Sequence, residues 1–371
     1  MIRNVKKTLD LARRSLLSRL GGNTRRQLAI KDGEISALRH QLSLAKGDEG
    51  TTLSQGIPVF FVLGYQKSGT TWLMRMLDAH PEILCRGEGR FFDGGWRQKN
   101  LKREGVERPP SSLYHALLDA EYLRLWIEHS VWSRDEPADE HLDNLTRMAV
   151  NYFLQGELLK TSKKMVGDKS PLLTPRTIEE IARIHPESRV IHIIRDGRDA
   201  AVSAAHHTWN FGNLEKSPEM LRKRTAYFAD PAGFRSSGES MFSEWQIQKL
   251  AEDWNSRVGS ATRSGPKLLG DNYVEVRYEA LVDRPENELE RLVKFLGAES
   301  RPKTIQRCVE STSFEKLSKG RERGREDPAS FFRKGVVGDW RNVFSERDRR
   351  IFKETAGETL VRLGYEADKN W

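Results

Sequence analysis

The chain has 371 residues, of which 37% are hydrophobic and 31% are charged, a composition typical of folded α/β domains rather than disordered chains. No apolar run approaches the roughly 18–20 residues that cross a bilayer, which argues against an integral membrane protein. The net charge is +9, and residues 1–50, with 11 basic and 5 acidic residues, account for +6 of it. Because the rest of the chain is only weakly basic, nucleic-acid binding is not predicted. The two cysteines, Cys85 and Cys308, are too few for a disulfide scaffold or a metal site, so we expect no metal and a cytoplasmic location.

Residues 1–50 are predicted to form a helical extension, and residues 51–371 the main domain. Apolar residues recur at steps of three or four from Ile2 to Leu20 among basic residues, which indicates a basic amphipathic helix. Three alternatives stay open for residues 1–45: peripheral contact with a membrane surface, self-association, or a solvated extension packed on the body. A transit peptide is a less favoured interpretation of this segment, because transit peptides are rich in serine and the serine content here is modest.

Residues 58–63 form a continuous apolar run, which predicts a parallel strand buried on both faces. The segment Tyr-Gln-Lys-Ser-Gly-Thr-Thr-Trp follows at residues 65–72, and apolar residues at helical spacing come next. A strand, a glycine-bounded loop and a helix together present backbone N–H groups to a phosphate. Gly64 and Gly69 have the Walker A spacing, but Thr70 stands where Walker A has its lysine, and the lysine here is Lys67.

This segment resembles the phosphosulfate loop of sulfotransferases that use 3′-phosphoadenosine 5′-phosphosulfate (PAPS), whose motif is approximately PKSGTTW. The resemblance implies PAPS as co-substrate and a single P-loop-type α/β domain, with a parallel five-stranded sheet flanked by helices, over roughly residues 57–368. It implies that Lys67 reaches the bridging oxygen, where negative charge grows as the S–O bond breaks. Trp72 would stack on the adenine or, alternatively, pack in the core. The residues implied to bind the 5′-phosphate are Ser68, Gly69, Thr70 and Thr71.

A second strand is expected near residues 82–86, and the sequence continues Arg-Gly-Glu-Gly-Arg-Phe-Phe-Asp to residue 93. The run from residue 76 to 90 resembles the tyrosylprotein sulfotransferases, and its last part resembles the heparan sulfate O-sulfotransferases. Both resemblances imply that Glu88 is the general base and that Arg90 contacts the acceptor or the sulfonate. An exposed loop carboxylate paired with a neighbouring arginine is the alternative for Glu88.

A third strand is expected near residues 164–167 and is followed by Asp168 and Lys169. The resemblance implies that Lys169 binds a sulfonate oxygen and takes part in catalysis, with Asp168 orienting it. The cytosolic sulfotransferases carry a histidine base in the corresponding stretch, which this chain lacks. His206 and His207 are therefore the remaining candidates if Glu88 is not the base.

A fourth strand is expected at residues 189–194, in which His192 is predicted to be a core residue. Arg195 follows directly, where ligand-binding residues gather in open α/β sheets. Arg195 and Ser203 have the eight-residue separation of the 3′-phosphate motif of sulfotransferases, so both are predicted to bind the donor, and Ser203 joins the catalytic set. Residues 210–240 are rich in small and basic residues and are predicted to form a mobile insertion that covers the acceptor site.

Tyr278 follows a fifth expected strand, residues 273–277, and resembles a nucleotide-contact position, as do Thr312 and Phe314. The segment Phe-Phe-Arg-Lys-Gly-Val-Val-Gly-Asp-Trp, residues 331–340, resembles the RKGxxGDW segment of the cytosolic sulfotransferases. The resemblance implies that the segment binds the 3′-phosphate and borders the adenine with one of its two phenylalanines. The residues so implied are Phe331 or Phe332, Arg333, Lys334 and Gly335.

The sequence therefore predicts a sulfotransferase that moves a sulfuryl group in line from PAPS to a hydroxyl, with a carboxylate base. The acceptor is not identified: a carbohydrate, a lipid and a small alcohol or phenol all remain open. A P-loop kinase or NTPase is the alternative, and a non-catalytic nucleotide-binding protein is the third hypothesis. The displaced lysine and the lack of an evident Walker B acid disfavour a kinase.

Overall fold

The structure is a computed structural model that describes residues 57–92, 112–171, 173–212, 217–368 and 370–371. The predictions made for residues 1–50, including the amphipathic helix and any contact through residues 1–45, lie outside these described residues. The described residues belong to one compact unit, residues 57–371. The division of the chain into an extension and a main domain stays a prediction.

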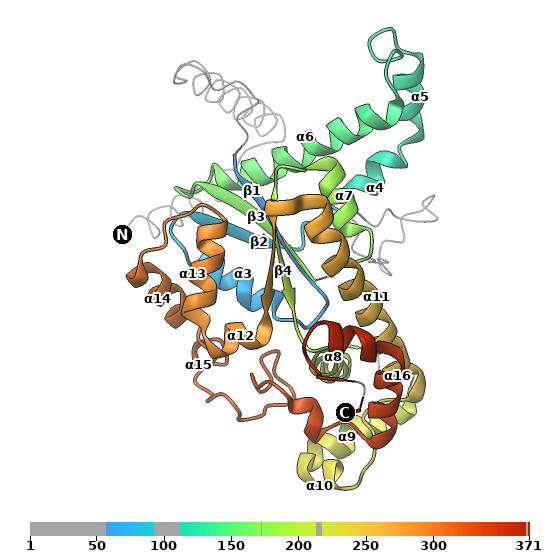
Figure 1. The fold of residues 1–371 in the computed structure, drawn as a ribbon, viewed down its shortest axis with the longest axis vertical. Helices are drawn as coiled ribbons and strands as arrows, with labels where there is room; N and C mark the ends of the chain where they lie inside the picture. The colour runs from blue at the N-terminus through green and yellow to red at the C-terminus, as the bar shows by residue number, and fades with distance from the viewer. Residues whose placement is uncertain (1–56, 93–111, 172, 213–216, 369) are drawn as a thin grey trace, which may run out of the picture. The chain divides into compact units, whose positions relative to one another are not determined.

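Five parallel strands form one sheet in the order β2-β3-β1-β4-β5, which confirms the predicted fold class (Figure 1). The central strand β1 pairs with β3 on one side and β4 on the other, and all six of its residues are buried, as its continuous apolar sequence predicts. The strands are β1 (Val59–Gly64), β2 (Ile83–Gly87), β3 (Met165–Ser170), β4 (Arg189–Ile194) and β5 (Tyr273–Arg277).

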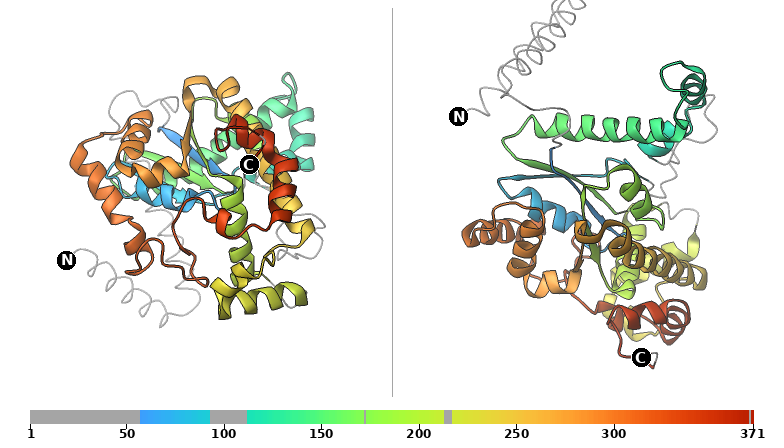
Figure 2. Two further views of the ribbon diagram at one scale, coloured as in Figure 1. Left: turned by 60° about the horizontal axis from the view of Figure 1, so that its bottom comes forward. Right: turned by 45° about the horizontal axis from the view of Figure 1, so that its top comes forward.

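Helices cover both faces of the sheet because successive residues of each strand point to opposite sides. Phe60 and Val62 of β1 belong to a core shared with α3, α12, α13 and α14, whereas Phe61 and Leu63 belong to a core shared with α6, α7 and α11. Figure 2 shows the same layers from two further sides, with the strands between these helices. The bounds are α3 (Thr70–Asp78), α6 (Ala138–Leu158), α7 (Thr177–Ile184), α11 (Glu244–Leu269), α12 (Tyr278–Asp283), α13 (Pro285–Phe295) and α14 (Pro302–Ser311).

A third core joins the C-terminal helix to the segment after β4. The described part of residues 210–240, for which a mobile insertion over the acceptor site is predicted, is mostly helical, and Tyr227 and Phe234 are buried in this core beside Trp209. The mobility of this segment and its place over the acceptor site stay predictions. Pro218 and Pro231 each occupy the first turn of a helix, where a missing N–H costs nothing. The helices of this core are α8 (Gly197–Phe211), α9 (Pro218–Ala229), α10 (Pro231–Ser236) and α16 (Glu346–Arg362).

The remaining helices are short and connect these layers. They are α4 (Leu113–Leu118), α5 (Glu121–His129), α15 (Phe314–Leu317) and the 3-10 turns η2 (Gly270–Asn272) and η3 (Asp339–Asn342). In the part of the chain that the structure describes, no helix combines the length and the apolarity needed to span a membrane.

Candidate active site

The carboxyl ends of the five strands lie at one edge of the parallel sheet, and Glu88, Arg195 and Tyr278 directly follow three of them. A cavity of about 370 Å³ opens there. The structure brings most of the predicted residues to its wall, whereas Ser68, Arg90, Lys169 and Thr312 do not line it. Those that do are Lys67, Gly69, Thr70, Thr71, Trp72, Glu88, Arg195, Ser203, Tyr278, Phe314, Phe331, Phe332, Arg333, Lys334 and Gly335.

The phosphate loop runs from the end of β1 to the start of α3. Gly69 begins α3 with φ +92°, and a side chain there would lie 2.6 Å from the Tyr278 ring, so only glycine fits. No side chain caps the N-terminus of α3 and no acidic residue stands in its first turn. The Ser68 hydroxyl is buried without a hydrogen-bond partner among the described residues. An uncapped helix start beside an unpartnered hydroxyl suits a phosphate group.

Lys67 is a cation held inside the cavity wall without a carboxylate partner in the described part of the chain. Its backbone has φ +65°, a left-handed conformation that costs a non-glycine residue about 1–2 kcal/mol. Its Nζ lies 4.6 Å from the centre of the Phe331 ring. Burial, together with the nearby Arg195 guanidinium, lowers the pKa of Lys67 to about 8. The site thus holds a positive charge that an anion would stabilise.

We expect kcat/KM for the donor to fall as pH rises through about 8. The reason is that Lys67 carries its charge only below its lowered pKa, and kcat/KM reports the ionisation of the free enzyme. The corresponding fall in kcat should occur at higher pH than the fall in kcat/KM, because a bound anion favours the charged form of Lys67. The measurement is a pH profile of initial rates, with Lys67→Ala as the variant that lacks this fall. A value of kcat/KM that does not change between pH 7 and pH 9 would contradict the role of Lys67.

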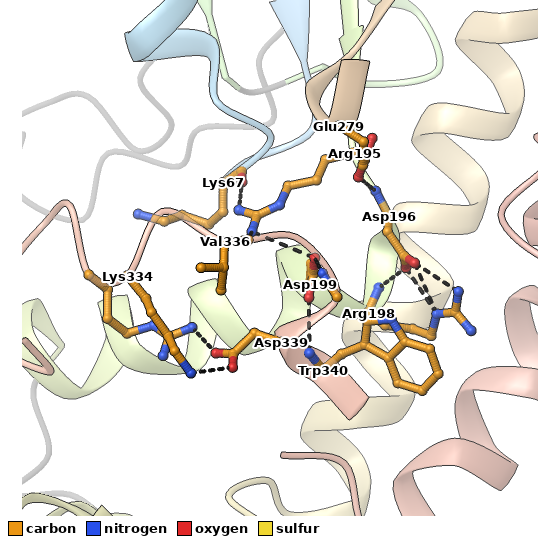
Figure 3. Close-up of polar contacts among 12 residues, drawn as sticks. Lys67, Arg195, Asp196, Arg198, Asp199, Glu279, Lys334, Val336, Asp339 and Trp340 are labelled. Atoms are coloured by element: carbon orange, nitrogen blue, oxygen red, sulfur yellow. Dashed lines mark hydrogen bonds and ion pairs between the residues drawn. The ribbon is translucent and has the colours of Figure 1, made fainter. Parts of the chain in front are cut away.

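Arg195 connects the phosphate loop to the C-terminal segment, as Figure 3 shows. One terminal nitrogen donates to the Lys67 carbonyl oxygen at 3.0 Å, and the other donates to the Val336 carbonyl oxygen at 3.4 Å. The guanidinium lies 4.3 Å from the centre of the Tyr278 ring and 11% of the side chain is exposed. Its Nε is buried and has no partner among the described residues. Its second terminal nitrogen also lies 3.8 Å from Asp199 Oδ2, so Arg195 has a carboxylate neighbour as well, and Nε is the donor that remains for a ligand.

The C-terminal segment supplies two further cations, but both are paired with carboxylates. Arg333 contacts Asp339 at 2.5 Å and Glu326 at 2.6 Å. Lys334 contacts Asp339 at 2.7 Å (Figure 3). Burial alone would raise the pKa of Asp339, but Arg333 and Lys334 outweigh it and hold that pKa well below its usual range. A phosphate bound here would share these cations with Asp339, so their role in donor binding stays a prediction.

Glu88 also lines the cavity and directly follows β2. Its carboxylate accepts a hydrogen bond from Lys169 Nζ at 2.8 Å, and 48% of the side chain is exposed, whereas only 4% of Lys169 is. Lys169 therefore lies behind Glu88 instead of lining the cavity. Glu88 and Arg90 both have left-handed backbones, with φ +68° and +54°. Asp168 accepts a hydrogen bond from the Gly89 N–H at 2.9 Å, so it holds the Glu88 loop rather than Lys169.

The three histidines considered in the sequence have different surroundings. His192 is fully buried with Nδ1 2.7 Å from the Tyr273 hydroxyl, which confirms it as a core residue. His206 is buried between aromatic rings, and burial with the nearby Arg333 lowers its pKa to about 3, so it is a poor base. His207 lines the cavity, and burial with Lys67 lowers its pKa. His207 is the remaining histidine alternative to Glu88.

Five lining residues were given no role in the sequence analysis: Gln66, Pro171, Leu317, Arg323 and Val336. Arg323 lies 5.7 Å from the Trp72 ring centre and 5.9 Å from that of Phe314, so a cation stands beside the aromatic wall. The glycine-punctuated basic stretch at residues 320–325 was a signal that could have indicated it. Trp72 is partly buried and its indole N–H donates to the Thr312 carbonyl oxygen at 3.0 Å, which fixes its ring at the cavity.

The five-stranded parallel sheet with helices on both faces defines an α/β protein, with a glycine-bounded loop between its central strand and α3. A sequence profile of the family described as "Sulfotransferase domain" matches residues 58–364. The chain belongs to this sulfotransferase domain family.

Curated relatives share about a quarter of their residues with the chain. A Caenorhabditis elegans protein named protein-tyrosine sulfotransferase A is 25% identical over 276 residues, which cover 72% of this chain and 57% of the relative. Cytosolic sulfotransferase 1 of Danio rerio is 23% identical over 304 residues, covering 80% of each chain. Sulfotransferase 1A1 of Rattus norvegicus is 25% identical over 182 residues, 47% of this chain and 56% of the relative. The match thus spans little more than half the length of the nematode and rat proteins.

Two solved structures illustrate the structural similarity. The crystal structure of mouse sulfotransferase SULT7A1 complexed with PAP has 19% identity and a TM-score of 0.45, covering 82% of this chain and 84% of that chain. A sulfotransferase from Alicyclobacillus acidocaldarius has 16% identity and a TM-score of 0.40, and the match covers 83% of this chain and 94% of that chain.

Proposed function

We propose that this chain transfers a sulfuryl group from PAPS to a hydroxyl group of an acceptor. The observation that carries the proposal is Lys67: a partly buried cation without a carboxylate partner among the described residues, in the loop before α3, at the cavity that Glu88 also lines. A Walker A lysine would follow Gly69, and Thr70 occupies that position. The position of Lys67 therefore favours the phosphosulfate over ATP as donor.

The residues divide into a donor side and an acceptor side. On the donor side, the start of α3 binds the 5′-phosphate, and Arg195 with Ser203, Arg333 and Lys334 binds the 3′-phosphate. The aromatic wall with Trp72 borders the adenine. On the acceptor side, Glu88 takes the proton of the hydroxyl as its oxygen attacks the sulfur. Lys67 stabilises the charge that grows on the bridging oxygen as the bond to sulfur breaks and PAP leaves.

The acceptor is a hydroxyl compound, and carbohydrates, lipids and small alcohols or phenols are all candidates. The relatives support both peptide and small-molecule acceptors, because their names include protein-tyrosine and 3-beta-hydroxysteroid sulfotransferases. A panel for screening is therefore 4-nitrophenol, a 3-hydroxysteroid, a long-chain alcohol, a monosaccharide and a tyrosine peptide, each incubated with PAPS. Mass spectrometry then identifies which of them gains a sulfuryl group.

The proposed location is the cytoplasm. Support comes from the two cysteines, which are free and buried, and from the name of the Danio rerio relative. Membrane contact or self-association through residues 1–45 remains a prediction from the sequence.

The donor is tested by thermal stabilisation with PAP in the absence of magnesium, compared with ATP plus magnesium. We expect PAP to stabilise the chain, because the cavity offers cations and helix N–H groups that need no metal to bind phosphate. Arg195→Ala should weaken PAP binding by about 2–5 kcal/mol, because truncating one partner of a buried charged pair leaves the other unpaired. Binding is measured by calorimetry, and circular dichroism checks that the variant is folded.

The matched control is Arg301→Ala, which removes an exposed arginine paired with Glu299 and absent from the cavity wall. This control should bind PAP as the unsubstituted chain does. Stabilisation by ATP and magnesium alone would favour the kinase alternative and refute the proposal. Equal PAP affinity in the Arg195 and Arg301 variants would show that PAP does not bind at this site.

A further inference from the structure

Two neighbouring residues at the end of β3 hold the Glu88 loop through three hydrogen bonds. Lys169 Nζ donates to the Glu88 carboxylate at 2.8 Å, and the Lys169 carbonyl oxygen accepts the Glu88 N–H at 2.8 Å. Asp168 Oδ1 accepts the Gly89 N–H at 2.9 Å. The Glu88 side chain, its backbone and the next peptide group are therefore all fixed by one dipeptide.

The two side chains act from opposite faces of the sheet, because successive residues of a strand point to opposite sides. Lys169 lies on the face of α3, where its side chain passes close to Met74 and Gly87. Asp168 lies on the other face, that of Val166 and Phe61. Both side chains are buried, with 3% and 5% of Lys169 and Asp168 exposed. The loop end is clamped between them.

A clamp is needed because this loop has an unfavourable backbone. Glu88 and Arg90, on either side of Gly89, both have positive φ, at a cost of about 1–2 kcal/mol each for residues with a side chain. Such a conformation persists only when surrounding contacts determine it. Of the bonds named above, only that of Asp168 reaches the peptide group between the two strained residues.

We propose that Asp168 is a positioning residue that fixes the carboxylate of Glu88 toward the acceptor by holding Gly89 between two left-handed residues. This inference rests on the proposed function, in which Glu88 is the base. It assigns to Asp168 no contact with donor or acceptor, since Asp168 does not line the cavity. Its effect is therefore on the placement of the base and not on the binding of PAP.

The hydrogen bond, and not the negative charge, is the required property. Burial raises the pKa of Asp168 to about 7, so the neutral form is populated near neutrality, and the carbonyl oxygen of that form still accepts the Gly89 N–H. Asparagine keeps an acceptor oxygen at the same position and has no charge. Asp168→Asn and Asp168→Ala therefore separate the hydrogen bond from the carboxylate.

The experiment measures turnover with PAPS and the most active alcohol of the acceptor panel, PAP affinity by calorimetry, and amide hydrogen exchange of residues 86–92. For Asp168→Ala we expect kcat to fall by about 10–100-fold, because small misplacement of a reacting group costs rates of this order. Exchange at Gly89 should become faster and PAP affinity should stay within about twofold. Asp168→Asn should restore slow exchange and most of the turnover.

The matched control is Asp78→Ala. Asp78 also accepts a backbone N–H of β2, that of Cys85 at 3.1 Å, but it stands at the end of α3 away from the cavity. Its removal should lower stability and speed local exchange at Cys85 without a selective loss of kcat.

Unchanged kcat or unchanged exchange at Gly89 in Asp168→Ala would overturn the inference. A loss of PAP affinity parallel to the loss of kcat would overturn it too. An Asp168→Asn variant as impaired as Asp168→Ala would also overturn it. Failure of the unsubstituted chain to bind PAP would instead refute the proposed function, and hydrogen exchange would still report whether Asp168 holds the loop.

Discussion

Replacing Lys67 with alanine is expected to lower turnover by about 10²–10³-fold, the usual cost of removing one group that stabilises charge in a transition state. PAP affinity should fall by less than about tenfold, because an interaction that strengthens as the bond breaks contributes more to kcat than to ground-state binding. Burial of Lys67 strengthens this effect, since charges interact more strongly away from water. The measurements are single-turnover rates with PAPS and calorimetry with PAP.

Lys319→Ala is the matched control, because Lys319 also has a left-handed backbone, with φ +63°, but is exposed and absent from the cavity wall. Its turnover should equal that of the unsubstituted chain, so strain from alanine at positive φ cannot explain the loss at Lys67. Equal losses of PAP affinity and turnover in Lys67→Ala would mean that the lysine only binds the donor.

Replacing Glu88 with glutamine is expected to lower turnover of an alcohol by about 10²–10⁴-fold, the range of general-base catalysis. Glutamine keeps the size of the side chain and an oxygen that accepts from Lys169 Nζ, so the loop should remain in place. PAP affinity should stay within about twofold, because Glu88 acts on the acceptor. The loss should be smaller for 4-nitrophenol, whose acidic proton needs less help to leave. Rates for both acceptors are compared by detection of the sulfated products.

Glu82→Gln provides the control. Glu82 pairs with Lys164 just before β3, as Glu88 pairs with Lys169 near its end, but it lies outside the cavity wall. Its variant should show unaltered turnover. Turnover of the alcohol by Glu88→Gln at the rate of the unsubstituted chain would exclude Glu88 as the base, and His207 would be the next residue to replace.

The sheet, and the meeting of Lys67, Gly69 and Arg195 at one cavity, could be predicted because their signals are local. The apolar run of β1 and the loop with Lys67 and Gly69 are contiguous in sequence, and the backbone of this candidate phosphate site is set by that short segment. Arg195 was found in the same way, directly after a buried strand. In a parallel sheet the strand ends converge, so residues that follow different strands meet without further information.

The other features depend on contacts between distant segments. The burial of Tyr227 and Phe234 within residues 210–240 was not predicted, because these side chains pack against helices that no local pattern indicates. The pairing of Arg333 with Glu326 and Asp339, and of Lys334 with Asp339, lowers the free positive charge of a segment that was predicted to bind phosphate through these two cations. The burial of Lys169 behind Glu88 and the bond from Gly89 to Asp168 join residues about 80 positions apart, which spacing alone does not reveal.

The account is tested most directly by incubating the chain with PAPS and the acceptor panel, without magnesium, and identifying products by mass spectrometry. We predict that PAP and a sulfated hydroxyl compound appear in equal amounts, and that Lys67→Ala suppresses both while Lys319→Ala does not. PAPS that remains intact with every acceptor, together with phosphate transfer or hydrolysis when ATP and magnesium are supplied, would contradict it.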